Sequence, residues 1–141
     1  MSALPLPADI IVHTLARREF EVFLELVFRH LNPDTPLSRG WYLSAMCQAL
    51  HEVAQGHERR LQITVPPRHL KSIMTTVAFP AWLLGQRPET RIICASYGQE
   101  LSAALSRSFR KVIHSRWYSE VFPQTAASII RNTEADLGTR Q

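Results

Sequence analysis

The chain has 141 residues, of which 45% are hydrophobic and 20% charged, and its formal net charge is +4. This balance is typical of one modest globular domain and argues against a disordered chain. No apolar run is long enough to span a membrane, and Met1 to Asp9 lack the pattern of a signal peptide, so we expect a cytoplasmic protein. The positive charge fits a polyanionic partner, but an ordinary basic surface explains it equally well.

The first part of the chain, residues 1–58, predicts a helical lead-in. Apolar residues recur near a 3.6-residue period from Ala8 to His30, and the turn-forming Asn32-Pro33-Asp34 follows. A second apolar stripe runs from Trp41 to Gln55. Gly56, just after it, is suited to a left-handed helix end.

The remainder, residues 59–141, predicts a strand–loop–helix–strand–helix unit. Leu61 to Val65 alternates and is rich in β-branched residues, and Arg91 to Ser96 has the unbroken apolar centre of a buried parallel strand. Such a unit forms a parallel sheet with a right-handed crossover, so the predicted fold class is α/β. The other expected elements are helices over Lys71 to Phe79, where Pro80 breaks or kinks the chain, over Gln99 to His114 and over Trp117 to Phe122, and one possible strand over Ser128 to Arg131.

The candidate chemistry is concentrated between the first expected strand and its helix, in Val65-Pro66-Pro67-Arg68-His69-Leu70-Lys71-Ser72. Free backbone N–H groups at a helix N-terminus favour an anion. Lys71 could reach the β- and γ-phosphates of a nucleotide, and the Ser72 hydroxyl could bind a magnesium ion that bridges them. A plain turn before an ordinary helix explains the segment about equally well when it is considered alone.

The loop departs from the standard pattern G-x-x-x-x-G-K-[ST], because Val65 and Leu70 occupy the glycine positions. Pro66 and Pro67 have no N–H group to donate, so the amide cradle must come from Arg68 to Ser72. A positive φ would cost a leucine about 1–2 kcal/mol. We therefore expect Leu70 to keep a negative φ.

The loop and the segments around it resemble the large subunit of phage and prophage terminases, the ATP-driven DNA-packaging motors. That family carries a loop of the type V-P-P-R-[HG]-x-K-S, and the similarity extends from about residue 20 to the end of the chain. The segments that carry it downstream include Phe79-Pro80-Ala81-Trp82-Leu83-Leu84-Gly85, Ala95-Ser96-Tyr97 and Trp117-Tyr118. The resemblance implies a partial P-loop NTPase core of the RecA-like class, a parallel sheet with flanking helices behind the helical lead-in.

The resemblance also implies ATP and Mg²⁺ as cofactors and assigns roles to individual residues. Lys71 and Arg68 match catalytic positions, with Arg68 stabilising charge on the transferring phosphoryl group, although a salt-bridged loop residue explains Arg68 equally well. Trp41 lies in the part of the lead-in that approaches adenine in such proteins, but core packing is its favoured role. The implied nucleotide contacts are Pro67, Arg68, His69, Leu70, Lys71 and Ser72, with Ser72 also on the magnesium ion.

The acids that an ATPase needs are missing from the pattern. No apolar run ending in paired acids follows Lys71, the family's RNase H-like nuclease is absent, and Glu134 and Asp136 lie in a polar tail that predicts a solvated turn. Hydrolysis needs carboxylates to hold magnesium and to orient the attacking water, so we expect a truncated ATPase segment that is catalytically incomplete alone. The alternative is a non-catalytic prophage remnant that contacts protein or DNA. A small kinase is disfavoured because no lid or base-binding motif is visible.

The partners implied by the resemblance are double-stranded phage DNA, the terminase small subunit and the portal protein, in a bacterial host cell. No membrane partner is expected, and an oligomer is expected only for a full-length family member. A solvated helix face is the default for the basic residues that could otherwise face DNA, Arg107, Arg110, Lys111 and Arg116. Ser96 follows the second expected strand, where ligands gather in open α/β sheets; a helix cap is its favoured role, and a nucleic-acid or phosphate contact is the alternative.

The cysteines and histidines give no sign of a metal site. Cys47 and Cys94 lie far apart in apolar stretches, so we expect two small buried hydrophobic residues in a reducing compartment. The six histidines show no metal-ligand spacing.

Overall fold

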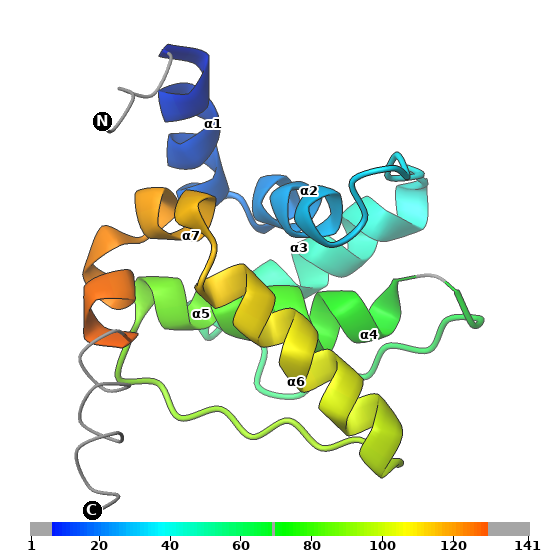
Figure 1. Cartoon of the computed structure of the whole chain (residues 1–141). Helices are drawn as coiled ribbons and strands as arrows, with labels where there is room; N and C mark the ends of the chain where they lie inside the picture. The colour runs from blue at the N-terminus through cyan, green and yellow to red at the C-terminus, as the bar shows by residue number, and fades with distance from the viewer. Residues whose placement is uncertain (1–6, 69, 130–141) are drawn as a thin grey trace, which may run out of the picture.

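The computed structural model describes residues 7–68 and 70–129, and in those ranges helices are the only regular elements (Figure 1). The first three are α1 (Pro7–Arg18), α2 (Phe20–Leu31) and α3 (Trp41–Gln55). A continuous helical stretch follows, made of α4 (Lys71–Ile73), the π-helix η1 (Met74–Ala78) and α5 (Phe79–Gln86). The last elements are α6 (Gln99–Ile113), α7 (Arg116–Val121) and a helical segment over residues 123–129. None of the described helices is long and apolar enough to cross a bilayer.

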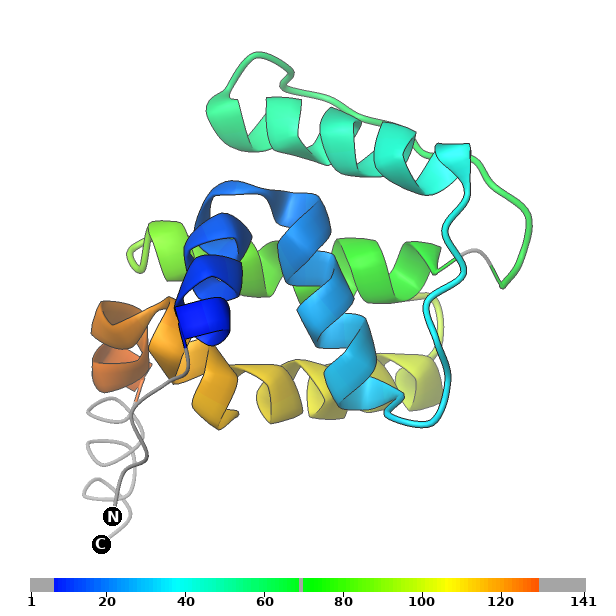
Figure 2. The same cartoon turned by 90° about the horizontal axis from the view of Figure 1, so that it is seen from above.

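The expected parallel sheet is absent from the described chain, so the predicted α/β, RecA-like fold class is wrong. Residues 61–65 and 91–96 are extended, but no backbone hydrogen bond joins either segment to another described part of the chain. In Figure 2 the first segment runs back alongside α3, and in Figure 1 the second passes below α5 and α6. Residues of high β-propensity are those that fit a half-buried, extended backbone. Here the two extended segments lie against helices and have no neighbouring strand within the described ranges.

The first expected helix is divided in two at Glu19, which has φ −110° and ψ 113°. The break leaves the last carbonyl groups of α1 without partners inside the helix. Two side chains of α5 satisfy two of these groups: Trp82 Nε1 donates to the Ala16 carbonyl at 3.0 Å, and Gln86 Nε2 donates to the Arg17 carbonyl at 3.0 Å. Periodicity could not reveal this break, because the chain keeps an apolar face on both sides of it.

The other helix predictions hold closely. α3 has the predicted bounds, and Gly56 ends it in the left-handed region with φ 80°. α6 and α7 begin and end within one residue of the predicted bounds. The possible strand beginning at Ser128 is wrong where the chain is described, because Ser128 and Ile129 are helical.

Pro80 was expected to break or kink its helix, yet the helical stretch continues through it. Proline lacks an N–H group, and in an α-helix its ring presses on the carbonyl group four residues earlier, which here belongs to Thr76. Thr76 lies inside η1, where the wider π turn spreads the backbone. We attribute the π turn to this requirement of Pro80.

The core is rich in aromatic residues and joins the lead-in helices to the later ones. Phe20 packs against Trp82 with ring centroids 5.4 Å apart, and Phe23 packs against Phe122 at 5.8 Å. Tyr118 is fully buried, its hydroxyl donates to the Ala81 carbonyl at 2.7 Å, and burial raises its pKa above the usual range. One hydrophobic cluster therefore draws on residues from both sides of the boundary expected near residue 58.

Candidate functional site

The loop from Val65 to Ser72 leads into α4 and borders a cavity of about 590 Å³. The cavity gathers most of the residues that the sequence predicts for phosphate binding. Its lining consists of Val65, Pro66, Pro67, Arg68, Leu70, Lys71, Ser72 and Ile73. His69, the remaining predicted contact, lies outside the described residues.

Two residues of this loop have left-handed backbones. Arg68 has φ 67°, and Leu70 has φ 60° and ψ 7°. The expectation that Leu70 keeps a negative φ is therefore wrong. Each such residue costs about 1–2 kcal/mol, and strain of this kind in a non-glycine residue is concentrated at functional sites.

The conformation of Leu70 has a direct geometric consequence. It is followed at once by the helical Lys71, and the helix starts with the Met74 N–H group donating to the Leu70 carbonyl at 2.9 Å. A left-handed residue followed by a right-handed one turns successive N–H groups toward one concave side, which is an arrangement that binds anions. The backbone can thus form an anion cradle here without glycine.

The residues at the two glycine positions anchor the loop to the core. Val65 and Leu70 are both half-buried and pack against the hydrophobic core, as do Ile63 before the loop and Ile73 after it. The loop is consequently a short connection between two anchored ends. Tertiary packing at these anchors explains how the chain keeps Leu70 in a conformation that leucine avoids.

The charged and polar side chains among the described residues of the loop point to solvent. Arg68, Lys71 and Ser72 are exposed, and none has a side-chain hydrogen bond or ion pair within residues 7–68 and 70–129. Arg68 therefore forms no salt bridge with a residue in those ranges, contrary to the second interpretation of its role. No Asp or Glu is among the described residues that line the cavity, so its electrostatic character is basic.

The favoured prediction that Trp41 packs in the core is wrong, because 85% of its surface is exposed. It is the first residue of α3, whose buried face is formed instead by Leu43, Met46, Cys47 and others further along. Both views place the start of α3 and the start of α4 at the same end of the molecule (Figures 1 and 2). An exposed indole therefore stands at the end of the molecule that carries the loop.

The predictions for Ser96 and for the two cysteines have different outcomes. Ser96 does not cap α6, whose N-cap is Gly98. Cys47 is buried as expected, and burial, with a smaller effect of Glu21, raises its pKa to about 12. Cys94 is exposed, contrary to expectation, because its segment is not covered by a sheet.

The basic residues of α6, Arg107, Arg110 and Lys111, are exposed, and Arg116 donates to the Glu120 carboxylate at 3.0 Å. Glu134 and Asp136 lie outside the described residues. The described chain contains no group of three or more His, Cys, Asp or Glu side chains suited to hold a metal.

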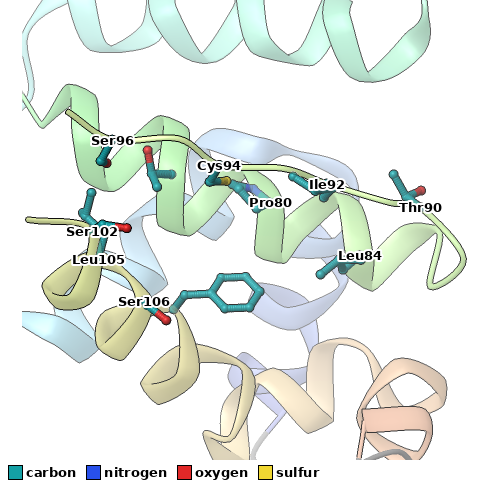
Figure 3. A pocket seen from close by; sticks show the side chains of 11 residues that line it. Pro80, Leu84, Thr90, Ile92, Cys94, Ser96, Ser102, Leu105 and Ser106 are labelled. Carbon is teal, nitrogen blue, oxygen red and sulfur yellow. The ribbon is translucent and has the colours of Figure 1, made fainter. Parts of the chain in front are cut away.

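A second cavity, of about 420 Å³, lies below the extended segment that follows α5 and is not predicted by the sequence (Figure 3). The only sequence signal was the alternation of Thr90, Ile92, Cys94 and Ser96, which the structure places on the side of the segment that faces α5 and α6.

Comparison of the chain with protein-family models, with curated proteins and with solved structures finds no match.

Proposed function

We propose that the loop from Val65 to Ser72 binds the phosphate chain of ATP together with Mg²⁺, and that the chain acts as the N-terminal ATPase segment of a phage-type terminase large subunit. The observation that carries the nucleotide proposal is the left-handed Leu70 directly before the helical Lys71. It supports an amide cradle in the absence of the standard glycines. The terminase assignment is supported by the sequence resemblance of the loop and its flanks.

The side chains of the loop supply the remaining interactions. The Lys71 ammonium group, exposed and without a partner among the described residues, is suited to the β- and γ-phosphates. Arg68 adds a guanidinium group, which favours planar contacts with phosphate oxygens. Both cations border one cavity that no described acid neutralises.

The residues present fit a magnesium ion that arrives with the nucleotide. The Ser72 hydroxyl is exposed and has no partner among the described residues, so it can provide one oxygen ligand. Mg²⁺ takes its other ligands from phosphate oxygens and water. Because no described carboxylate lines the cavity, we propose nucleotide binding by this chain and not efficient turnover. Trp41 is the proposed adenine contact.

Titration with ATP and Mg²⁺ by calorimetry tests the proposal. Wild-type protein should bind saturably, and Lys71→Ala should weaken binding at least about tenfold, equivalent to about 1.4 kcal/mol. Lys111→Ala is the matched control, because it removes an exposed lysine from α6. The proposal fails if wild-type protein shows no saturable binding or if the two variants bind equally well. AMP in place of ATP should bind more weakly, because the loop contacts phosphate.

Double-stranded DNA is the proposed macromolecular partner, with the exposed basic residues of α6 as the contact. Replacing Arg107, Arg110 and Lys111 by alanine should weaken binding of a fluorescent duplex and reduce its salt dependence, because fewer counterions are released. Unchanged affinity and salt slope would exclude α6 as the DNA contact. DNA binding that persists while ATP binding fails would favour the non-catalytic remnant.

A further inference from the structure

The extended segment from Thr90 to Ser96 forms the roof of the 420 Å³ cavity, with the helical stretch η1–α5 and helix α6 as its walls (Figure 3). Side chains alternate along this roof. Ile92 and Cys94 line the cavity, whereas Ile93 faces away and is 95% exposed. The backbone of residues 91–96 makes no hydrogen bond to other described residues, so side-chain packing alone holds the roof over the cavity.

The lining combines an apolar body with many hydroxyl groups and no charge. Its apolar members are Pro80, Leu84, Ile92, Leu105 and Phe109. Its hydroxyl groups belong to Thr76, Thr90, Ser96, Ser102 and Ser106, and none of the five has a side-chain hydrogen-bond partner within the described ranges. Cys94 adds one thiol, and no Asp, Glu, Lys, Arg or His is among the described lining residues.

We propose that this cavity binds a neutral small molecule with an apolar ring and one or more hydroxyl or carbonyl groups. Its volume lies within the roughly 300–1,000 Å³ of small-molecule sites, which are mostly apolar with a few polar groups. A charged ligand is disfavoured, because the cavity offers no counter-charge and moving an ion from water costs far more than moving a hydrogen-bonded neutral group. Hydroxyl groups both donate and accept hydrogen bonds, which suits neutral oxygen-containing ligands.

This site is separate from the phosphate loop. The two cavities share no lining residue, and the nearest approach along the chain is Ile73 of the loop and Thr76 of η1. A failure of the loop to bind ATP would therefore leave the proposal for this second cavity unaffected.

Disulfide capture at Cys94 tests the proposal. The probes are three symmetrical disulfides of similar size, carrying a hydroxymethylphenyl, an ammonium or a carboxylate group. In the exchange the Cys94 thiolate attacks one sulfur, a mixed disulfide forms, and the other half leaves as a thiolate that takes up a proton. Cys47 is buried and does not compete. The neutral aromatic probe should remain attached to Cys94 at a concentration of competing 2-mercaptoethanol about tenfold higher than either charged probe tolerates. The reason is that non-covalent binding of the probe in the cavity adds to the free energy of disulfide exchange.

A matched pair of leucine substitutions on α6 provides the control. Ser106→Leu places a larger side chain in the cavity and should abolish the preference for the neutral probe. Ala103 is exposed and does not line the cavity, so Ala103→Leu should leave that preference unchanged. Thermal melting of both variants checks that they fold. Equal capture of the three probes by wild-type protein, or an unchanged preference in a folded Ser106→Leu, would overturn the proposal.

Discussion

Gly85 and Phe122 are in such close contact that a Cβ atom on Gly85 would lie 2.4 Å from Cδ2 of the Phe122 ring. Phe122 is only 4% exposed and also packs against Phe23. The segment after α7 closes over the same point, because the Thr125 hydroxyl donates to the Leu84 and Gly85 carbonyls at 3.2 and 3.0 Å. The end of α5 is thus fixed by Phe122 and Thr125, which lie 37 to 41 positions later in the chain.

Gly85→Ala is expected to destabilise the protein by about 1–3 kcal/mol, because the new methyl group overpacks the core at Phe122. Urea unfolding followed by circular dichroism measures the effect. Gly98→Ala is the comparison variant: nothing lies within 4 Å of its Cβ position, so it loses only the preference of a helix N-cap for glycine over alanine and introduces no overpacking. Equal stability of Gly85→Ala and wild type would refute the close contact.

Tyr118→Phe should lower the free energy of unfolding by about 0.5–1.5 kcal/mol, because it removes a hydrogen bond to the Ala81 carbonyl in the core. Tyr97→Phe removes the same hydroxyl from a fully exposed side chain and should change nothing measurable. If both variants lose the same stability, the buried hydrogen bond is not the cause.

Stability should fall in alkaline solution. Burial raises the pKa of Cys47 from 9.0 to about 12, and it also raises the pKa of Tyr118 from 10.0. Both groups stay neutral in the fold at a pH where the unfolded chain ionises them. Their contribution is therefore complete below about pH 9 and is lost as the pH rises toward the folded values. Urea midpoints measured between about pH 8 and pH 11 should show this fall, and a Cys47→Ala, Tyr118→Phe double variant should flatten it.

The left-handed conformation of Leu70 gives a prediction with a definite sign. Leu70→Gly and Leu70→Ala both remove the half-buried side chain, but only glycine adopts a positive φ without cost. The glycine variant should therefore be the more stable by about 1 kcal/mol. At a right-handed position alanine would be the more stable of the two, so unfolding measurements on this pair decide the backbone conformation.

The helices of this protein are largely predictable from its sequence, whereas the two expected strands are absent from the described residues. The apolar stripe of α3 and the glycine after it identified both ends of that helix, because the same stripe packs on the core. Residues 61–65 and 91–96 have strand-like composition, but no local pattern says whether a partner strand lies beside them.

The candidate site was predictable in part. The Lys71-Ser72 pair at the start of a helix indicated the loop, yet the left-handed Leu70 depends on how Val65 and Ile73 are anchored in the core. The exposure of Trp41 and the cavity below residues 90–96 depend on how distant segments are arranged, since the cavity is lined by residues as far apart as Thr76 and Ser106, and periodicity cannot supply this arrangement.

The π turn of η1 determines how this stretch responds to a change in its length. A π turn contains about one residue more than an α turn of the same span, and each residue of an α-helix turns the chain by about 100°. Deleting one residue between Met74 and Ala78 would restore an α turn of the same span, so Lys71 should keep nearly the same direction relative to the buried Trp82. Deleting one residue from the α-helical turn after Phe79 would instead rotate Lys71 by about 100° relative to the residues that follow, so the harm done by a deletion depends on where in the stretch it falls.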